Sequence, residues 1–110
     1  MKIFGAFDFD GTLVKRKGIP TSSNVWFDKP FEGAVETLQF LHEQKIGFYI
    51  LTNRTEEDWP LIRAWLKKWE FPIPDRILIT NKKQKNTTFY LDDRAIRFTG
   101  NWQDFRKLYF

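Results

Sequence analysis

The segment Ile3-Phe4-Gly5-Ala6-Phe7-Asp8-Phe9-Asp10-Gly11-Thr12-Leu13 is the part of this chain around which the other elements can be arranged. An apolar run of strand-forming residues that ends in two carboxylates and a glycine turn indicates a buried strand that delivers charge to the rim of a sheet. Side chains alternate along a strand, so Asp8 and Asp10 project to the same side. Two neighbouring carboxylates repel each other and need a cation or a shared proton. A hard divalent cation such as Mg²⁺, which takes oxygen ligands, is the simplest answer.

The composition narrows the class of protein. A chain of 110 residues makes one domain, and the absence of cysteine excludes disulfides, zinc-thiolate sites and thiol nucleophiles. With no signal-peptide core and no apolar run of about 18 residues, we expect a soluble protein of the cytoplasm. Eighteen Lys and Arg against 14 Asp and Glu give a net charge of +4, which weakly favours anionic partners.

The rest of the chain alternates between strand-like and helical patterns. We expect a flap over 14–29, helices over 30–45, 55–69 and 103–108, and strands over 48–51, 76–80 and 88–91. The last helix is expected to pack Phe105 and Leu108 back on the sheet. This order predicts an α/β fold, a single Rossmann-like three-layer domain with a parallel sheet and right-handed crossovers.

The predicted helix over 55–69 carries two further patterns. Thr55 with Asp58 three residues later resembles a capping box. Trp59, Trp65 and Trp69 follow at helical spacing. That spacing favours a core or subunit contact over a platform for stacking nucleic-acid bases.

Polar residues follow three of the predicted strands at the end where each strand stops. Asp8 and Asp10 follow the first strand, Thr52, Asn53 and Arg54 the second, and Asp92 and Asp93 the last. Ligands of parallel sheets bind outside the carboxyl ends of the strands. Strand ends also carry polar residues for turns and solubility, but three such groups at one edge predict a single site.

Taken together, these segments resemble the four motifs of the haloacid dehalogenase superfamily, beginning with Asp-x-Asp-Gly-Thr at residues 8–12. Most members are magnesium-dependent phosphotransferases. By this resemblance Asp8 would be the nucleophile and Asp10 the general acid and base. Thr52 would hold a phosphoryl oxygen. The magnesium ligands would be Asp8, the backbone carbonyl of Asp10, Asp92 and Asp93.

The third motif of that superfamily is a single lysine, and three lysines compete for the role. Lys82, Lys83 and Lys85 all lie before the last strand; Lys83 is favoured, Lys85 is next, and the others would belong to a solvated loop. Candidate substrate-binding residues are Asn53, Arg54, Lys85 and Arg94. Either arginine could instead form an ion pair with the acidic residues.

A second, narrower resemblance concerns the C-terminal part of the chain. The segment Tyr90-Leu91-Asp92-Asp93-Arg94-Ala95-Ile96, followed by Gly100-Asn101-Trp102, is similar to a group of short phage and bacterial proteins of the same superfamily. The short segments between the motifs leave no room for a cap domain at either of the positions where this superfamily usually inserts one. By resemblance, capless members act on macromolecular or extended substrates or use a neighbouring subunit to cover the site, which makes a homo-oligomer an expectation here.

These inferences lead to one principal function and two alternatives. The principal function is a Mg²⁺-dependent phosphatase that forms an aspartyl phosphate. Its substrate would be a phosphorylated small molecule or a phosphate-ended nucleic acid, with no membrane partner. The alternatives are a nucleic-acid-binding module with vestigial activity and a structural or regulatory subunit that keeps the fold. The presence of both Asp8 and Asp10 argues against lost chemistry, because binding alone has no need of the second carboxylate.

Overall fold

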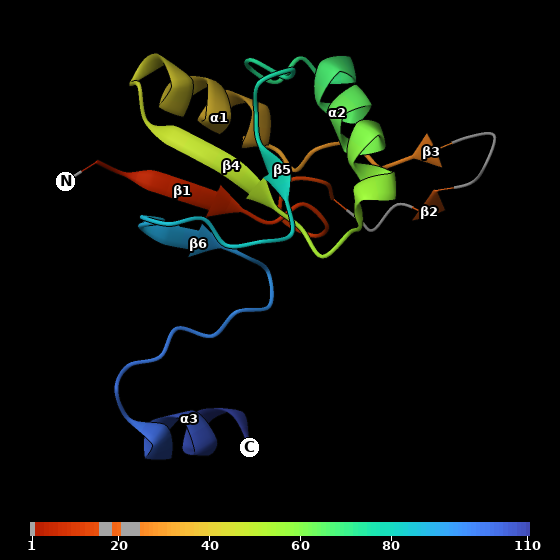
Figure 1. Ribbon diagram of the computed structural model, residues 1–110. Helices are drawn as coiled ribbons and strands as arrows, with labels where there is room; N and C mark the ends of the chain where they lie inside the picture. Colours follow the sequence, from red (N-terminus) through yellow and green to blue (C-terminus); the bar gives the residue numbers. More distant parts are fainter. Residues whose placement is uncertain (1, 16–18, 21–24) are drawn as a thin grey trace.

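A four-stranded parallel sheet forms the centre of the molecule (Figure 1). The computed structural model describes residues 2–15, 19–20 and 25–110. The strands, in the spatial order β5-β4-β1-β6, are Ile79–Thr80, Gly47–Leu51, Phe4–Phe7 and Phe89–Leu91. The parallel pairing of all four confirms the predicted α/β, Rossmann-like fold. It also brings the carboxyl ends of the strands to one edge.

Two helices lie on the same side of this sheet (Figure 1). They are α1 (Ala34–Glu43) and α2 (Trp59–Lys68), and the short 3₁₀ helix η1 (Glu56–Asp58) leads into α2. Phe7 and Ile50 from the sheet share one buried cluster with Leu38 of α1 and Trp65 of α2. Trp59 and Trp69 are partly buried against the same cluster. Of the two expected roles for the tryptophan stripe, core or subunit contact, the structure shows the core.

The opposite face of the sheet is covered by a loop. Tyr49 of β4 is fully buried on this face. Its hydroxyl accepts a hydrogen bond from the backbone N–H of Gln84 at 3.1 Å and lies 2.7 Å from Thr87 Oγ1. The segment that joins β5 to β6 thus crosses under the sheet and forms the third layer without a helix.

Helix α1 begins later than predicted. We expected it to start at Pro30, but the backbone of residues 30 and 31 instead pairs with the segment that follows β1. The N–H of Phe31 donates to the carbonyl of Leu13 at 2.9 Å, and Pro30 forms a bridge with Val14. Gly33, with φ of 88°, then redirects the chain into the helix.

The predicted flap contains two short strands. β2 (Ile19–Pro20) and β3 (Val25–Trp26) pair antiparallel, while residues 16–18 and 21–24 lie outside the described part of the chain. After β3 the chain is anchored to the core, because Phe27 is buried with its ring 4.9 Å from that of Phe9.

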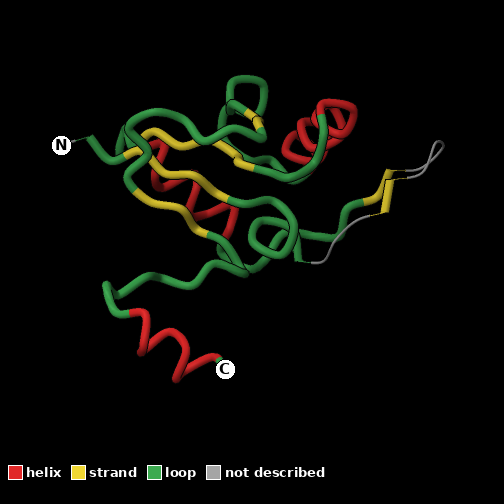
Figure 2. The backbone as a smooth tube through the Cα atoms, turned by 60° about the horizontal axis from the view of Figure 1, so that its bottom comes forward, coloured by secondary structure: helices red, strands yellow, loops and turns green. Residues whose placement is uncertain are grey.

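The C-terminal helix does not pack on the sheet, contrary to the expectation. α3 (Trp102–Tyr109) lies apart from it in both Figure 1 and Figure 2. Leu108 is 74% exposed. The rings of Phe105 and Tyr109 lie 5.8 Å apart, so the apolar side chains of this segment contact one another. The side chain of Asn101 caps the helix by accepting from the N–H groups of Gln103 and Asp104. None of the described helices has the length and apolar character that a membrane span requires.

Candidate active site

The pairing of β1 with β6 brings two acidic segments together. Phe7 is in register with Leu91, and the N–H of Asp8 donates to the carbonyl of Leu91 at 3.0 Å. The residues that follow these two strands therefore leave the sheet side by side. The oxygens of Asp8, Asp92 and Asp93 lie within 4.8 Å of one another as a result.

A tight backbone turn positions Asp10. The carbonyl of Phe9 accepts the N–H groups of Thr12, Leu13 and Val14 at 3.0 to 3.3 Å. Phe9 itself is fully buried, so the turn is fixed to the core. The backbone of Asp10 is therefore held in place by this turn, which limits the positions that its side chain can take.

The three clustered carboxylates have the chemistry of a divalent-cation site. The pKa of the Asp8 carboxyl rises from 3.8 to about 6, chiefly because the group is partly buried and secondarily because Asp92 repels its charge. Asp93 adds to the increase, while a hydrogen bond from the backbone N–H of Phe9 opposes it. A hard cation with oxygen ligands would remove this repulsion, so the donor set fits such an ion. In such a site the side-chain ligands would be Asp8, Asp92 and Asp93.

Thr52 presents a hydroxyl group beside the acidic cluster. It is 3% exposed, and its N–H donates to the carbonyl of Thr80 at 2.9 Å. Its Oγ1 accepts the N–H of Arg54 at 3.1 Å. Because the oxygen is used as an acceptor on that side, its proton can be donated to a ligand in the pocket.

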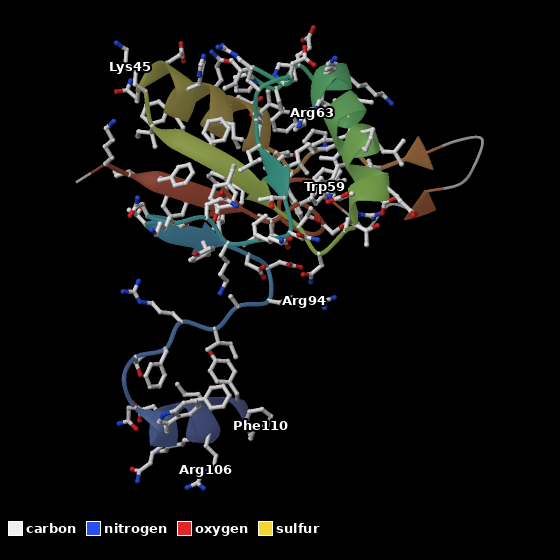
Figure 3. The ribbon with its side chains drawn as sticks, viewed as in Figure 1. Lys45, Trp59, Arg63, Arg94, Arg106 and Phe110 are labelled. Carbon is white, nitrogen blue, oxygen red and sulfur yellow. The ribbon has the colours of Figure 1, made fainter. Side chains whose placement is uncertain are left out.

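An open pocket of about 640 Å³ joins these groups. It collects every sequence-predicted site residue except Lys85, namely Asp8, Asp10, Thr52, Asn53, Arg54, Lys83, Asp92, Asp93 and Arg94. Arg94 lies on the segment that leaves β6, and its side chain projects outward from the ribbon (Figure 3). The three strand ends thus form one site.

The structure separates Lys83 from Lys85, and Lys82 is exposed and lines neither of the two cavities in which they lie. Lys83 lines the pocket, and its Nζ lies 5.2 Å from the centre of the Tyr90 ring. Lys85 instead lines a different cavity, together with Lys2 and Lys45, at the end of the sheet where β1 and β4 begin. The prediction that Lys85 binds substrate is therefore corrected. Because β5 and β6 are parallel, the connecting loop must cross from the carboxyl edge to the amino edge, and it does so between Lys83 and Lys85.

Arg54 forms the ion pair that the sequence left as an alternative to substrate binding. Its guanidinium donates to both carboxylate oxygens of Asp10 and to Asp58. The capping box predicted for Thr55 and Asp58 is wrong, because the side chain of Thr55 makes no capping hydrogen bond. The carboxylate of Asp58 forms an ion pair with Arg54 instead. The spacing of four residues between Arg54 and Asp58 was a readable signal for this pair. Phe27, whose ring lies 4.8 Å from the guanidinium carbon, had no such signal.

Comparison with known proteins agrees with this geometry. A family described as haloacid dehalogenase-like hydrolase matches residues 5–89, which is well over half of the chain. No curated protein and no solved structure matches. The matched region contains Asp8, Asp10, Thr52 and Lys83 in the order expected from the motifs. This chain is therefore a member of the haloacid dehalogenase-like hydrolase family.

Proposed function

We propose that the protein is a Mg²⁺-dependent phosphatase that hydrolyses a phosphomonoester through an aspartyl phosphate on Asp8. The observation that carries this proposal is the content of one pocket: a carboxylate nucleophile (Asp8), a hydroxyl donor (Thr52) and a cation (Lys83). These are the groups that phosphoryl transfer requires, namely an attacking oxygen and donors for the phosphoryl oxygens.

In the first step a carboxylate oxygen of Asp8 attacks phosphorus. A bond forms between Asp8 and phosphorus, and the bond from phosphorus to the leaving oxygen breaks. Asp10, which is protonated at the start of the cycle, gives its proton to that oxygen and becomes a carboxylate. In the second step Asp10 takes a proton from water, whose oxygen attacks phosphorus. The bond to Asp8 then breaks, so inorganic phosphate leaves and both aspartates return to their starting state.

Asp10 keeps the capacity for this proton transfer despite its contacts with Arg54. A carboxylate has about four lone-pair sites on its two oxygens. Arg54 uses one site on each oxygen, through Nε at 2.7 Å and Nη2 at 3.0 Å. The sites that remain can exchange a proton with the leaving group and with water, and Asp10 lines the pocket in which both would lie.

The remaining residues bind the phosphoryl group and its cation. Magnesium held by Asp8, Asp92, Asp93 and the backbone carbonyl of Asp10 would neutralise the three carboxylates and the phosphoryl oxygens. Thr52 donates its hydroxyl proton to one phosphoryl oxygen, and Lys83 offers an ammonium group to another. Asn53 and Arg94 also line the pocket, and in this proposal they contact the part of the substrate beyond phosphorus.

The open pocket suits a substrate that extends beyond it. A phosphorylated small molecule and a phosphate-ended nucleic acid are both accommodated by such a site, and a second copy of the chain could cover it. A net charge of +4 favours either anionic substrate.

Hydrolysis of a generic aryl phosphate tests this function. We expect turnover with Mg²⁺, none after addition of EDTA, and recovery when Mg²⁺ is restored in excess. Asp8→Asn is the matched inactive variant. A rate that persists in EDTA would contradict the proposal, as would equal rates for the parent and Asp8→Asn. A panel of phosphorylated metabolites and phosphate-ended oligonucleotides would then identify the substrate class.

A further inference from the structure

Arg54 and Asp10 form an ion pair at the site in which each carboxylate oxygen accepts a hydrogen bond from the guanidinium. Nε of Arg54 lies 2.7 Å from Oδ2 of Asp10, and Nη2 lies 3.0 Å from Oδ1. The two side chains are only 14% and 15% exposed. A planar guanidinium that donates two parallel hydrogen bonds fixes both the position and the rotation of a carboxylate.

Arg54 is itself held from several sides. Nη1 donates to Asp58 Oδ2 at 3.3 Å, and the guanidinium carbon lies 4.8 Å from the ring centre of Phe27. The backbone carbonyl of Arg54 accepts the indole N–H of Trp59 at 3.0 Å. Hydrogen bonding to Asp10 is the main reason that the pKa of Arg54 lies above its usual range. A side chain restrained in this way can orient its partner rather than follow it.

The restraint separates Asp10 from the other carboxylates of the pocket. Asp10 is two residues from Asp8, yet the oxygens that gather within 4.8 Å belong to Asp8, Asp92 and Asp93. The charge that Asp10 carries after it has given its proton is met by Arg54, whereas the charge of the cluster is left for a cation. Arg54 therefore divides the acidic residues of the site into two groups with different tasks.

We propose that Arg54 is the positioning residue for Asp10, holding its carboxylate at the leaving-group side of the pocket and apart from the cation-binding cluster. This inference rests on the proposed phosphatase function. It also replaces the idea that Arg54 grips the substrate, because three of its donor atoms are already directed to Asp10 and Asp58. Asp58 and Phe27 act through Arg54 and do not touch the substrate.

A double-mutant cycle distinguishes positioning from substrate binding. Arg54→Gln should lower kcat by about 10²-fold, the loss that a misplacement of about 1 Å can cause, with KM little changed. In the Asp10→Asn background the same change should cost almost nothing more, because the group that Arg54 positions is already disabled. Arg54→Lys should recover only part of kcat, since an ammonium group cannot make the paired bonds. Arg76→Gln, an exposed arginine outside the pocket, is the matched control and should leave both constants unchanged.

Binding of inorganic phosphate in the presence of Mg²⁺, measured by calorimetry, separates failure of this inference from failure of the proposed function. Arg54→Gln should bind phosphate as the parent does. Additive losses of kcat in the cycle, or phosphate affinity at least tenfold weaker in Arg54→Gln, would show that Arg54 contacts the substrate and would overturn the inference. A parent that neither turns over aryl phosphate nor binds phosphate would overturn the proposed function, and this inference with it.

Discussion

The backbone of Gly11 lies directly against the carboxylate of Asp93, so closely that a Cβ on Gly11 would overlap Asp93 Oδ2. Gly11 also has φ of +80°, a conformation that other residues adopt with strain. One glycine therefore satisfies two needs: it turns the chain after Asp10 and leaves room for a carboxylate of the acidic cluster.

Gly11→Ala should weaken divalent-cation binding as well as stability. The strain alone should cost about 1 to 2 kcal/mol of the free energy of unfolding, while displacement of Asp93 should weaken the affinity for Mg²⁺. Calorimetric titration and urea unfolding measure the two effects. Gly33→Ala is the matched control, because Gly33 has φ of +88° with nothing within 4 Å of the added Cβ. Equal loss of cation affinity in both variants would contradict the role given to the Gly11 contact.

The lysines can be told apart by substitution. Lys83→Ala should remove most of the turnover at saturating substrate, because it removes the ammonium group at the pocket. Lys85→Ala should leave turnover unchanged, since Lys85 lines the cavity at the other end of the sheet. Steady-state kinetics of the two variants decide the matter. A damaging Lys85→Ala combined with a harmless Lys83→Ala would mean that the loop between β5 and β6 follows another path.

The raised pKa of Asp8 predicts a pH-dependent stability without divalent cations. Between its ordinary value of 3.8 and about 6, the folded protein retains a proton on Asp8 that the unfolded chain releases. The contribution of Asp8 to the free energy of unfolding is thus fully present below pH 3.8 and is lost as the pH rises through about 6. Magnesium should offset this loss by binding the ionised carboxylate. The increase in Tm on addition of Mg²⁺ should therefore become larger as the pH rises from 3.8 to about 6. Asp8→Asn should lack this growth, and a parent with the same pH dependence as Asp8→Asn would contradict the assignment.

Much of this site could be predicted from the sequence, because it depends on local patterns. The apolar strands with polar residues at their carboxyl ends, and the rule that parallel strands share one edge, were sufficient to bring Asp8, Thr52 and Asp92 together. The sequence favoured Lys83, but it could not show that Lys83 lines the pocket while Lys85 lies elsewhere, since that depends on where the loop crosses the sheet. The bond between Tyr49 and Gln84 that fixes this crossing joins residues 35 positions apart.

The structure also differs from the sequence-based prediction at strand β5 and at helix α3. Strand β5 is limited to Ile79 and Thr80, although the strand-like pattern extends over 76–80. The N–H groups of Arg76 and Ile77 both donate to the carbonyl of Ile73, so a turn takes the first part of that pattern. The spacing of apolar residues predicted helix α3 but not what its apolar face contacts. Such a face indicates that a helix packs against something, and the sequence does not say which element that is.

The leaving group should determine how much Asp10 matters. Asp10→Asn cannot give or take a proton, so turnover should fall by about 10² to 10⁴-fold, the usual contribution of general acid–base catalysis. The loss should be smaller for nitrophenyl phosphate than for an alkyl phosphate, because nitrophenolate leaves without protonation. Parallel kinetics with both substrates provide the check. Identical losses would leave Asp10 with a metal-binding or positioning role only.

The proposed function depends on phosphorylation of Asp8, which mass spectrometry of the Asp10→Asn variant can detect. This variant retains the nucleophile but cannot activate water, so the phosphorylated form should accumulate when nitrophenyl phosphate and Mg²⁺ are added and the reaction is stopped with acid. We predict a gain of one phosphoryl group on the peptide that contains Asp8, absent without Mg²⁺ and absent in Asp8→Asn. If the parent turns over substrate but Asp10→Asn gains no phosphoryl group on this peptide, or gains it on another residue, Asp8 is not the nucleophile.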